Sequence, residues 1–402
     1  MLIMDRFTLN RFPIKDKTIF LRADFNVPLA KGGITDNTKI KATLDTIKFL
    51  LHNDCKIVIA THLGRPDTPS TENSTKVIAK ELKRLLPSIT LVHLSDCIGK
   101  EIKEKIEKGK PKTIFMLENL RFYKEEEQND TFFAHSLATL AEIYVNDAFG
   151  VCHRKHASID AITRYMPSIA GLLVEKELYY LSKALSPKKP AVLIMGGAKL
   201  NKIHLLENAL RKYDYVLIGG ALAFSFLKAK GIPIGMSKAD SDSIEIAKKT
   251  LAGRNRSKII LPIDFKVAEK FTANSKTEII RYNEIKPNQI GLDIGPRSVA
   301  LFKKYLAPAK TIVWNGPLGY FEWASFAQST KDIGRYLGTL QDSITIAGGG
   351  ETTEALIKFH LHHSLTHLST GGGASIAYLS GEKLPGITAL EQNYKTFRRK
   401  II

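Results

Sequence analysis

The sequence predicts an α/β protein with two lobes, each built on a parallel β-sheet. At 402 residues the chain is longer than one hydrophobic core usually serves, so two domains are the default. Short apolar runs alternate with longer stretches suited to helices, and strands separated by helices indicate a parallel sheet. A single amphipathic helix expected at Leu172–Leu185 lies between the two series and is the candidate connector.

The first half has four apolar runs, and polar or cationic residues follow each of them. The expected strands are Thr18–Ala23, Lys56–Ala60, Thr113–Leu117 and Glu142–Val145. The residues that follow them are Asp24 and Asn26, His62 and Arg65, Arg121, and then Asn146, Asp147, His153 and Arg154. In a parallel sheet these positions share the carboxyl edge, where ligands bind. Because arginine matches phosphate and carboxylate with paired hydrogen bonds, a small, doubly anionic substrate is expected.

The second half has glycines where the first has cations. The strands expected there are Ala191–Met195, Tyr215–Ile218, Thr311–Trp314, Ser343–Ala347 and Leu365–Ser369, and each leads into a glycine-rich turn. Bare turns at one sheet edge let backbone amides approach a nucleotide. Neither a P-loop nor the G-x-G-x-x-G dinucleotide pattern occurs. The two halves are therefore expected to bind different ligands.

The stretch Ser343–Leu356 reads as a strand, a bare turn at Gly348–Gly350 and the start of a helix. Such a helix start holds an anion. Glu351 would repel phosphates unless a hard cation lies between them, which predicts a metal-nucleotide site with Mg²⁺. The alternative is an ordinary helix whose first-turn glutamate complements the dipole.

Composition excludes several classes of protein. No apolar run approaches the roughly 20 residues of a membrane span, and the first ten residues lack the features of a signal peptide, so a cytoplasmic protein without a membrane partner is expected. Three scattered cysteines fit no disulfide framework. The net charge of +19 comes mostly from dispersed residues, so a solvated surface is favoured over a nucleic-acid footprint. His363 and His367 have helical spacing, but surface or core histidines are favoured over a metal site.

Ten motifs taken together closely resemble the phosphoglycerate kinase family over essentially the whole chain. They are LRADFNVPL, THLGRP, LENLRF, VNDAFGVCHRKHAS, GGAK, LPIDF, GLDIGP, VWNGPLGYFE, GGGE and STGGGAS. The resemblance implies two Rossmann-like lobes: 1–170 binding 3-phosphoglycerate and 188–380 binding Mg-nucleotide. It also implies an interdomain helix at 171–187 and a terminal segment, 381–402, that returns to the amino lobe. The implied protein is a monomer that exchanges a phosphoryl group between 1,3-bisphosphoglycerate and ADP, giving 3-phosphoglycerate and ATP, with hinge closure.

The resemblance also implies roles for individual residues. The expected contacts with 3-phosphoglycerate are Asp24, Phe25, Asn26, Lys39, His62, Leu63, Gly64, Arg65, Arg121 and Arg154. The expected nucleotide contacts are Lys199, Lys202, Gly220, Asn315, Pro317, Glu322, Gly348, Gly349, Gly350, Glu351 and Thr352, with Glu322 on the ribose and Glu351 on the metal. The residues implied to be catalytic are Arg22, Lys39, Lys199, Lys202, Gly349 and Gly372.

Four positions depart from the family pattern. Lys39 stands where the family usually has an arginine, and Lys202 follows Lys199 one residue early. Ala221 replaces a usual glycine, and Glu351 replaces a usual aspartate. An active kinase is the leading hypothesis, because a pure binding protein needs no cationic rim beside a nucleotide rim. The alternative is a weakened relative that mainly binds nucleotide or nucleic acid.

Overall fold

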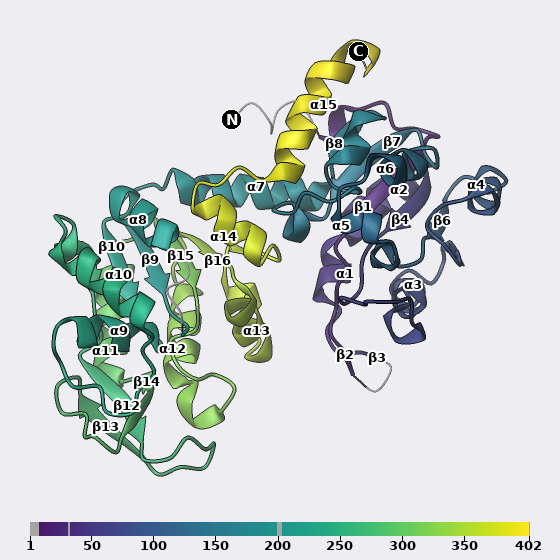
Figure 1. The fold of residues 1–402 in the computed structure, drawn as a ribbon. Coiled ribbons are helices and arrows are strands. Elements are labelled where there is room, and N and C mark those ends of the chain that lie inside the picture. The colour runs from purple at the N-terminus through teal and green to yellow at the C-terminus, as the bar shows by residue number, and fades with distance from the viewer. Residues whose placement is uncertain (1–7, 31–32, 199–202, 402) are drawn as a thin grey trace. The chain divides into compact units, whose positions relative to one another are not determined.

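The structure is a computed structural model that describes residues 8–30, 33–198 and 203–401 (Figure 1). The described chain divides into two compact units. Unit 1 runs to Tyr179 and resumes at Lys383, and unit 2 is Tyr180–Glu382. Each unit is built on a six-stranded sheet, so the predicted α/β class with parallel sheets is confirmed.

The sheet of unit 1 has the strand order β5-β6-β4-β1-β7-β8, and all its pairings are parallel. The strands are β1 (Thr18–Ala23), β4 (Lys56–Ala60), β5 (Thr90–His93), β6 (Thr113–Met116), β7 (Ile143–Asp147) and β8 (Ser168–Ala170). Leu21 in β1 pairs with Ile59 on one side and with Val145 on the other. The central strands are buried on both faces, as expected for a parallel sheet covered by helices.

Helices and turns connect these strands. The helices of unit 1 are α1 (Thr38–Ala42), α2 (Leu44–His52), α3 (Lys76–Leu85), α4 (Lys100–Glu107), α5 (Lys124–Glu127), α6 (Thr131–Ala138) and α15 (Pro385–Ile401). Its 3-10 turns are Leu9–Arg11, Thr71–Asn73, Leu120–Phe122, Phe149–Val151 and Ala161–Arg164. A small hairpin joins β2 (Leu29–Ala30) to β3 (Gly33–Ile34).

The main sheet of unit 2 has the order β11-β10-β9-β15-β16-β17 and is also parallel throughout. Its strands are β9 (Ala191–Met195), β10 (Tyr215–Ile218), β11 (Ile259–Ile260), β15 (Thr311–Asn315), β16 (Ile344–Ala347) and β17 (His367–Leu368). The helices are α8 (Ile203–Lys212), α9 (Leu222–Ala229), α10 (Ser241–Ala252), α11 (Pro296–Leu306), α12 (Gln328–Leu337), α13 (Gly350–Lys358) and α14 (Gly373–Leu379). The 3-10 turns are Arg256–Lys258, Ala324–Phe326 and His362–Ser364.

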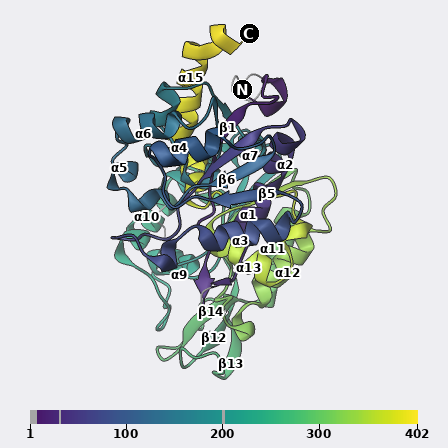
Figure 2. The same ribbon diagram turned by 90° about the vertical axis from the view of Figure 1, so that its right-hand side faces the viewer.

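Unit 2 also contains an antiparallel sheet that sequence reasoning did not predict. It consists of β12 (Asp264–Ala268), β13 (Thr277–Arg281) and β14 (Ile290–Ile294), with β12 in the centre (Figure 2). The edge strand β13 is mostly exposed, which is why its sequence gave a weak apolar signal. The half-exposed edge strand β5 was missed for the same reason, whereas β8 is buried but has only three residues and gives too short an apolar run.

Some predicted boundaries were also wrong. The strand expected at Leu365–Ser369 is only His367–Leu368, and the helical spacing of His363 and His367 does not hold. His363 lies in a 3-10 turn, whereas His367 lies in β17 and stacks on Tyr180 with ring centroids 4.6 Å apart. Backbone pairing with β16 therefore decides the conformation of His367.

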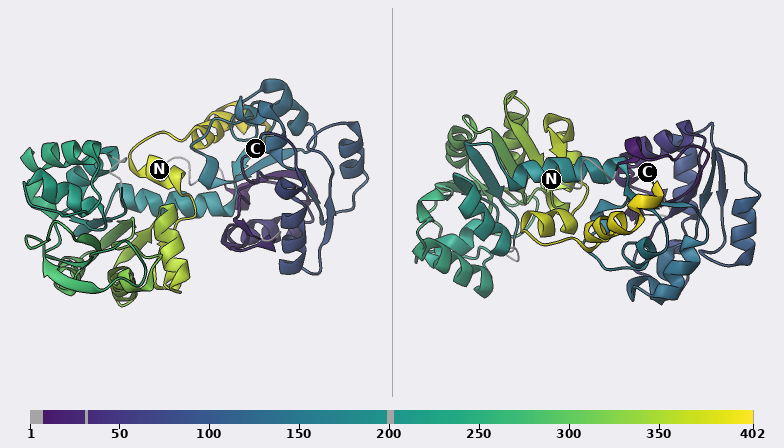
Figure 3. Two further views of the ribbon diagram at one scale, coloured as in Figure 1. Left: turned by 60° about the horizontal axis from the view of Figure 1, so that its bottom comes forward. Right: turned by 90° about the horizontal axis from the view of Figure 1, so that it is seen from above.

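One helix spans the division between the two units, and the C-terminal helix belongs to unit 1. The division between the units falls within α7 (Leu172–Leu185), a single continuous helix that Figure 3 shows in teal. The C-terminal helix α15 packs on β8 of unit 1. There Asn393 accepts a hydrogen bond from the Ser168 amide at 2.9 Å and donates one to Met166 O at 2.8 Å. None of the described helices is long and apolar enough to cross a membrane.

Candidate active site

A group of cationic side chains lies at the carboxyl edge of the unit 1 sheet. Strands β6, β4 and β1 are neighbours, so the loops that follow them lie side by side and bring Arg121, His62 and Asp24 together. All three side chains are largely buried. We call the basic side chains at this edge the basic cluster: Arg22, Lys39, His62, Arg65, Arg121 and Arg154.

Two polar contacts order the loop after β1. Lys39 Nζ lies 2.8 Å from Asp24 Oδ2. Burial alone would raise the pKa of Asp24, but the charge and hydrogen bond of Lys39, together with other nearby basic groups, hold this pKa below its usual value. Asn26 Oδ1 accepts a hydrogen bond from the Gly64 amide at 2.9 Å, which ties this loop to the loop after β4.

Arg121 has buried donors that make no hydrogen bond with any residue that the structure describes. Its Nη1 donates to Gly64 O at 2.5 Å. Its Nη2 lies 3.2 Å from Glu127 Oε1, but among the described residues neither Nη2 nor the buried Nε makes a hydrogen bond. Burial lowers the pKa of Arg121, and Glu127 opposes this shift. The cations that lower it further are Arg154, Arg22 and Arg65. Since buried donors are normally paired, this site is suited to an anionic ligand.

His62 acts here as a neutral polar group. Burial lowers its pKa well below the usual value, and the opposing charge of Asp24 does not restore it. Its Nδ1 lies 3.4 Å from Arg22 Nη2, so a neutral ring accepts at Nδ1 and carries its proton on Nε2. The positive charge of the cluster therefore comes from its arginines and Lys39.

The remaining residues of unit 1 that are expected to contact the substrate differ in how far their side chains are exposed. Arg65 is exposed, and Arg154 is half-buried with its Nε 3.5 Å from His153 Nε2. Phe25 and Leu63 are core residues. Their amides donate to Thr61 Oγ1 at 2.9 Å and to Asn119 Oδ1 at 3.2 Å. Their side chains therefore shape the loops and bring no polar atom to the edge.

The glycine turns of unit 2 lie along the carboxyl edge of its main sheet, and most of them pack on each other. Gly197 N donates to Pro317 O at 2.9 Å, and Gly220 N donates to Leu318 O at 3.0 Å. A Cβ added to Gly196 would lie 2.1 Å from Pro317 O. Several glycines are thus required by close backbone packing and not by a ligand.

Only part of the glycine set faces open space. A Cβ added to Gly350 or Gly372 would meet nothing within 4 Å. Gly349 adopts φ +100° and caps α13, so the first amides of this helix are oriented by a conformation that favours glycine. Gly348 donates its amide to Trp314 O at 3.0 Å and is engaged in the sheet edge.

An apolar pocket of about 130 Å³ lies beside these turns, and we call it the glycine pocket. Its apolar lining comes from Ala221, Phe224, Phe265, Leu292, Pro317, Leu318 and Phe321. Glu322 and Glu351 also line it, and both are exposed. An apolar slot with a few polar groups at its edge is typical of small-molecule sites.

Three of the expected nucleotide contacts connect the turns to one another. Asn315 Nδ2 donates to Gly348 O at 2.7 Å, and Thr352 Oγ1 accepts from Gly316 N at 2.6 Å. Pro317 contributes a carbonyl that accepts from Gly197. Asn315 and Thr352 are almost fully buried, so these bonds fix β15 against the start of α13.

Glu351 is the described residue that best fits a metal. It lies in the first turn of α13, and its Oε2 would be 3.2 Å from a Cβ on Gly197. Among the described residues no three acidic, histidine or cysteine side chains form a metal cluster. Mg²⁺ in nucleotide enzymes is usually held by one or two carboxylates plus phosphates and water, so a single exposed carboxylate fits this ion. Lys199 and Lys202 lie outside the described residues.

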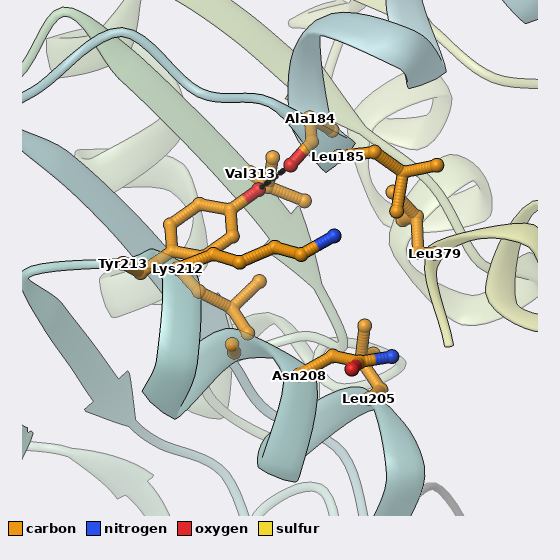
Figure 4. A pocket seen from close by; sticks show the side chains of 10 residues that line it. Ala184, Leu185, Leu205, Asn208, Lys212, Tyr213, Val313 and Leu379 are labelled. Atoms are coloured by element: carbon orange, nitrogen blue, oxygen red, sulfur yellow. Dashed lines mark hydrogen bonds between the residues drawn. The ribbon is translucent and has the colours of Figure 1, made fainter. Parts of the chain in front are cut away.

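A second cavity in unit 2 is too small for a ligand. It lies between the end of α7, α8 and α14 and has a volume of about 10 Å³ (Figure 4). Tyr213 Oη donates across it to Ala184 O at 2.7 Å. One water molecule needs about this volume, so the cavity has no room for a larger ligand and is a gap in the packing of the helices.

Sequence reasoning missed the buried residues that hold the basic cluster. Glu126 and Ser158 are fully buried and hydrogen-bonded to each other; Ser158 accepts from Arg22, and Glu126 forms an ion pair with Arg22 at 3.9 Å. Glu126 is one of three consecutive glutamates, and its neighbours on both sides are exposed. Only the alternation of burial in α5 distinguishes it, and such a short helix gives no clear periodicity.

Comparison with known proteins shows which family this chain resembles over nearly its whole length. A family model described as phosphoglycerate kinase matches residues 9–382. A phosphoglycerate kinase from Koribacter versatilis is 43% identical over 403 residues, covering 96% of this chain and 99% of its own. The solved phosphoglycerate kinase from Pyrococcus horikoshii is 33% identical with a TM-score of 0.86, covering 97% of this chain and 100% of its own. The one from Coxiella burnetii is 34% identical with a TM-score of 0.85 and covers 96% and 99%. This chain therefore belongs to the phosphoglycerate kinase family.

Proposed function

We propose that the basic cluster of unit 1 binds 3-phosphoglycerate and that the glycine pocket of unit 2 binds the nucleotide. The reaction is the reversible transfer of a phosphoryl group between 1,3-bisphosphoglycerate and ADP, which gives 3-phosphoglycerate and ATP. Family membership supports the activity. The different chemistry of the two sheet edges supports the assignment of each substrate to its unit.

The observation that carries the assignment in unit 1 is the state of Arg121. Its guanidinium is buried, its Nε and Nη2 make no hydrogen bond among the described residues although Glu127 lies 3.2 Å from Nη2, and other cations lie nearby, which favours an anion with several oxygens. The other side chains proposed to contact that anion are Asp24, Asn26, Lys39, His62, Arg65 and Arg154. Arg22 is 1% exposed, so its proposed contribution is its charge and its contact with His62.

The chemistry needs no general base. The acceptor is a carboxylate, which is already ionised at neutral pH, so no proton is removed when it attacks. The transferring phosphoryl group spreads its charge over three oxygens, and catalysis consists mainly of alignment and charge neutralisation. The arginines of the basic cluster would neutralise the phosphoglycerate, and the backbone amides at Gly349, Gly350 and Gly372 would donate to phosphate oxygens.

In unit 2 the glycine pocket would hold the base, with Glu322 at the ribose. Mg²⁺, which would be held by Glu351, would neutralise charge between the nucleotide phosphates. The Thr352 hydroxyl accepts from Gly316 N and still has a proton to donate to a phosphate. Lys199 and Lys202 are proposed phosphate contacts on the basis of the resemblance alone. In-line transfer requires the two substrates to meet, so the proposal includes hinge closure. A monomeric state and a cytoplasmic location stay predictions.

A coupled assay with 3-phosphoglycerate and Mg-ATP tests this function. We expect turnover that depends on both substrates and on Mg²⁺. Arg154→Ala should raise KM for 3-phosphoglycerate or lower kcat and leave nucleotide affinity unchanged. Glu322→Gln should raise KM for ATP alone. Nucleotide binding without turnover would contradict the enzyme, and selective loss of ADP binding in Arg154→Ala would overturn the assignment of the two units.

A further inference from the structure

Arg22 is a buried cation whose direction is set by a few contacts. It lies in β1 and is 1% exposed. Its Nε donates to Ser158 Oγ at 2.7 Å, and its Nη1 donates to the Ala23 carbonyl at 2.5 Å. Its Nη2 lies 3.4 Å from His62 Nδ1. These contacts point one edge of the guanidinium toward Ser158 and the other toward the basic cluster.

Glu126 lies behind Ser158 and is fully buried. Its Oε1 accepts from Ser158 Oγ at 2.6 Å, and its Oε2 accepts from Ser158 N at 2.9 Å. Both carboxylate oxygens therefore accept hydrogen bonds; burial raises the pKa of Glu126, and the charge of Arg22 and the two hydrogen bonds from Ser158 oppose this rise. Oε1 also lies 3.9 Å from Arg22 Nη2. The three residues thus form a continuous chain from Glu126 through Ser158 to Arg22.

Among the residues that the structure describes, Glu126 is the acid that forms an ion pair with Arg22, and the charge of Arg22 also lowers the pKa of Asp24. Asp24 is bonded to Lys39, and Glu127 lies beside Arg121. His156 Nδ1 is 3.8 Å from Glu126, but burial lowers the pKa of His156 to about 3, so this ring is neutral and does not compete for the carboxylate. A buried cation without a partner is strongly disfavoured.

We propose that Glu126, through the Ser158 hydroxyl, is a positioning residue that holds Arg22 toward His62 in the 3-phosphoglycerate site. The carboxylate neutralises one buried cation in a cluster whose arginines would otherwise repel each other. It also fixes the direction of the guanidinium by two hydrogen bonds in series. This inference rests on the proposed function of the basic cluster and assigns a role to a residue that would not touch the substrate.

The test compares Glu126→Gln with a matched control, Glu125→Gln. Glu125 is the exposed neighbour in α5. Glu126→Gln keeps the shape of the side chain but removes its charge, and we expect KM for 3-phosphoglycerate to rise on the order of tenfold, as for loss of a charged hydrogen bond. KM for Mg-ATP should stay within about twofold. Glu125→Gln should change neither value.

A cycle with Arg22→Gln decides whether Glu126 acts through Arg22. If it does, Glu126→Gln should add little to the effect of Arg22→Gln on 3-phosphoglycerate affinity, whereas independent effects would multiply. Ser158→Ala removes only the bridging hydroxyl and should shift KM for 3-phosphoglycerate in the same direction. This variant also serves if Glu126→Gln does not fold.

Equilibrium binding of 3-phosphoglycerate by calorimetry separates this inference from the proposed function. If the wild type binds 3-phosphoglycerate without turnover, the proposed kinase activity is wrong. The affinities of the wild type and the variants for 3-phosphoglycerate still decide the role of Glu126. If both KM values rise together, or if folded Glu126→Gln and Ser158→Ala bind 3-phosphoglycerate as the wild type does, the positioning role is overturned. Binding that is absent in the wild type would overturn the assigned site and the inference together.

Discussion

The ammonium of Lys39 lies 2.8 Å from the carboxylate of Asp24, where β1 ends at the edge of the basic cluster. About a third of the Lys39 side chain is exposed, so Asp24 does not enclose it and a ligand from solvent can reach it. A lysine ammonium is a compact point charge, whereas an arginine provides a planar pair of donors. The resemblance implies an arginine here, so Lys39 would keep the charge and lose the two-point contact.

Replacing Lys39 tests how much that geometry matters. We expect Lys39→Arg to keep or raise kcat, because the guanidinium adds a second donor without changing the charge. Lys39→Ala should lower kcat/KM by about tenfold or more, since it removes a charged hydrogen bond. Steady-state kinetics with varied 3-phosphoglycerate measures both. Full activity in Lys39→Ala would contradict a substrate role for this residue.

Arg121→Lys should weaken the phosphoglycerate site selectively. The change keeps the charge but removes the unpaired Nε and one of the paired donor directions. We expect KM for 3-phosphoglycerate to rise by about tenfold or more and KM for ATP to change by less than about twofold. Arg164→Lys, at an exposed arginine of the same unit, is the matched control. Equal kinetics for the two variants would show that Arg121 is structural.

Much of this site could be predicted from sequence because its residues follow buried strands directly. His62 and Arg121 follow β4 and β6, and the strand order brings them together without any long-range information beyond the parallel sheet. In unit 2 the expected nucleotide contacts came from the motifs that resemble the family. Periodicity and motif spacing therefore predicted the main sheets and the chemical contrast between their edges.

The rest depended on contacts between residues distant in sequence. Glu126 and Ser158 are 32 positions apart, and nothing in either stretch signals that they bond. The glycine turns were expected to bring backbone amides to a nucleotide, but Gly196 and Gly316 lie where two backbone segments pack directly on each other. The antiparallel strand β13 was missed because an exposed edge strand needs little apolar sequence.

Asp147 should give unit 1 a pH-dependent stability. Its Oδ1 accepts from the Leu173 amide at 2.9 Å at the start of α7, and burial raises its pKa to about 7 despite this bond. The unfolded carboxyl titrates near pH 4, so between about pH 4 and 7 the folded state holds a proton that the unfolded state lacks. The stability that this group contributes is therefore full below about pH 4 and falls as pH rises to about 7.

Asp147→Asn removes that titration. We expect the variant to gain stability relative to the wild type as the pH rises from 5 to 7.5. The difference in the free energy of unfolding should grow by up to about 1.4 kcal/mol per pH unit, and the difference in unfolding temperature should grow with it. Circular dichroism at a series of pH values measures the difference. Asp293, whose pKa burial also raises to about 7, titrates in both proteins and cancels. A difference that does not vary with pH would contradict an elevated Asp147 pKa.

Glu351→Asp tests the metal ligand and the longer side chain at this position. The carboxylate lies in the first turn of α13 near Gly197, where it would hold Mg²⁺ against the nucleotide phosphates. Because Mg²⁺ demands near-ideal geometry, aspartate, the usual residue of the family, should leave kcat equal or raise it. Glu351→Gln should instead lower kcat and raise the Mg²⁺ concentration needed for half-maximal rate. Glu354→Asp, an exposed change on the same helix, is the control. A loss of more than about tenfold in Glu351→Asp alone would mean that the pocket has adapted to glutamate, and unchanged Mg²⁺ dependence in Glu351→Gln would remove this residue from the metal site.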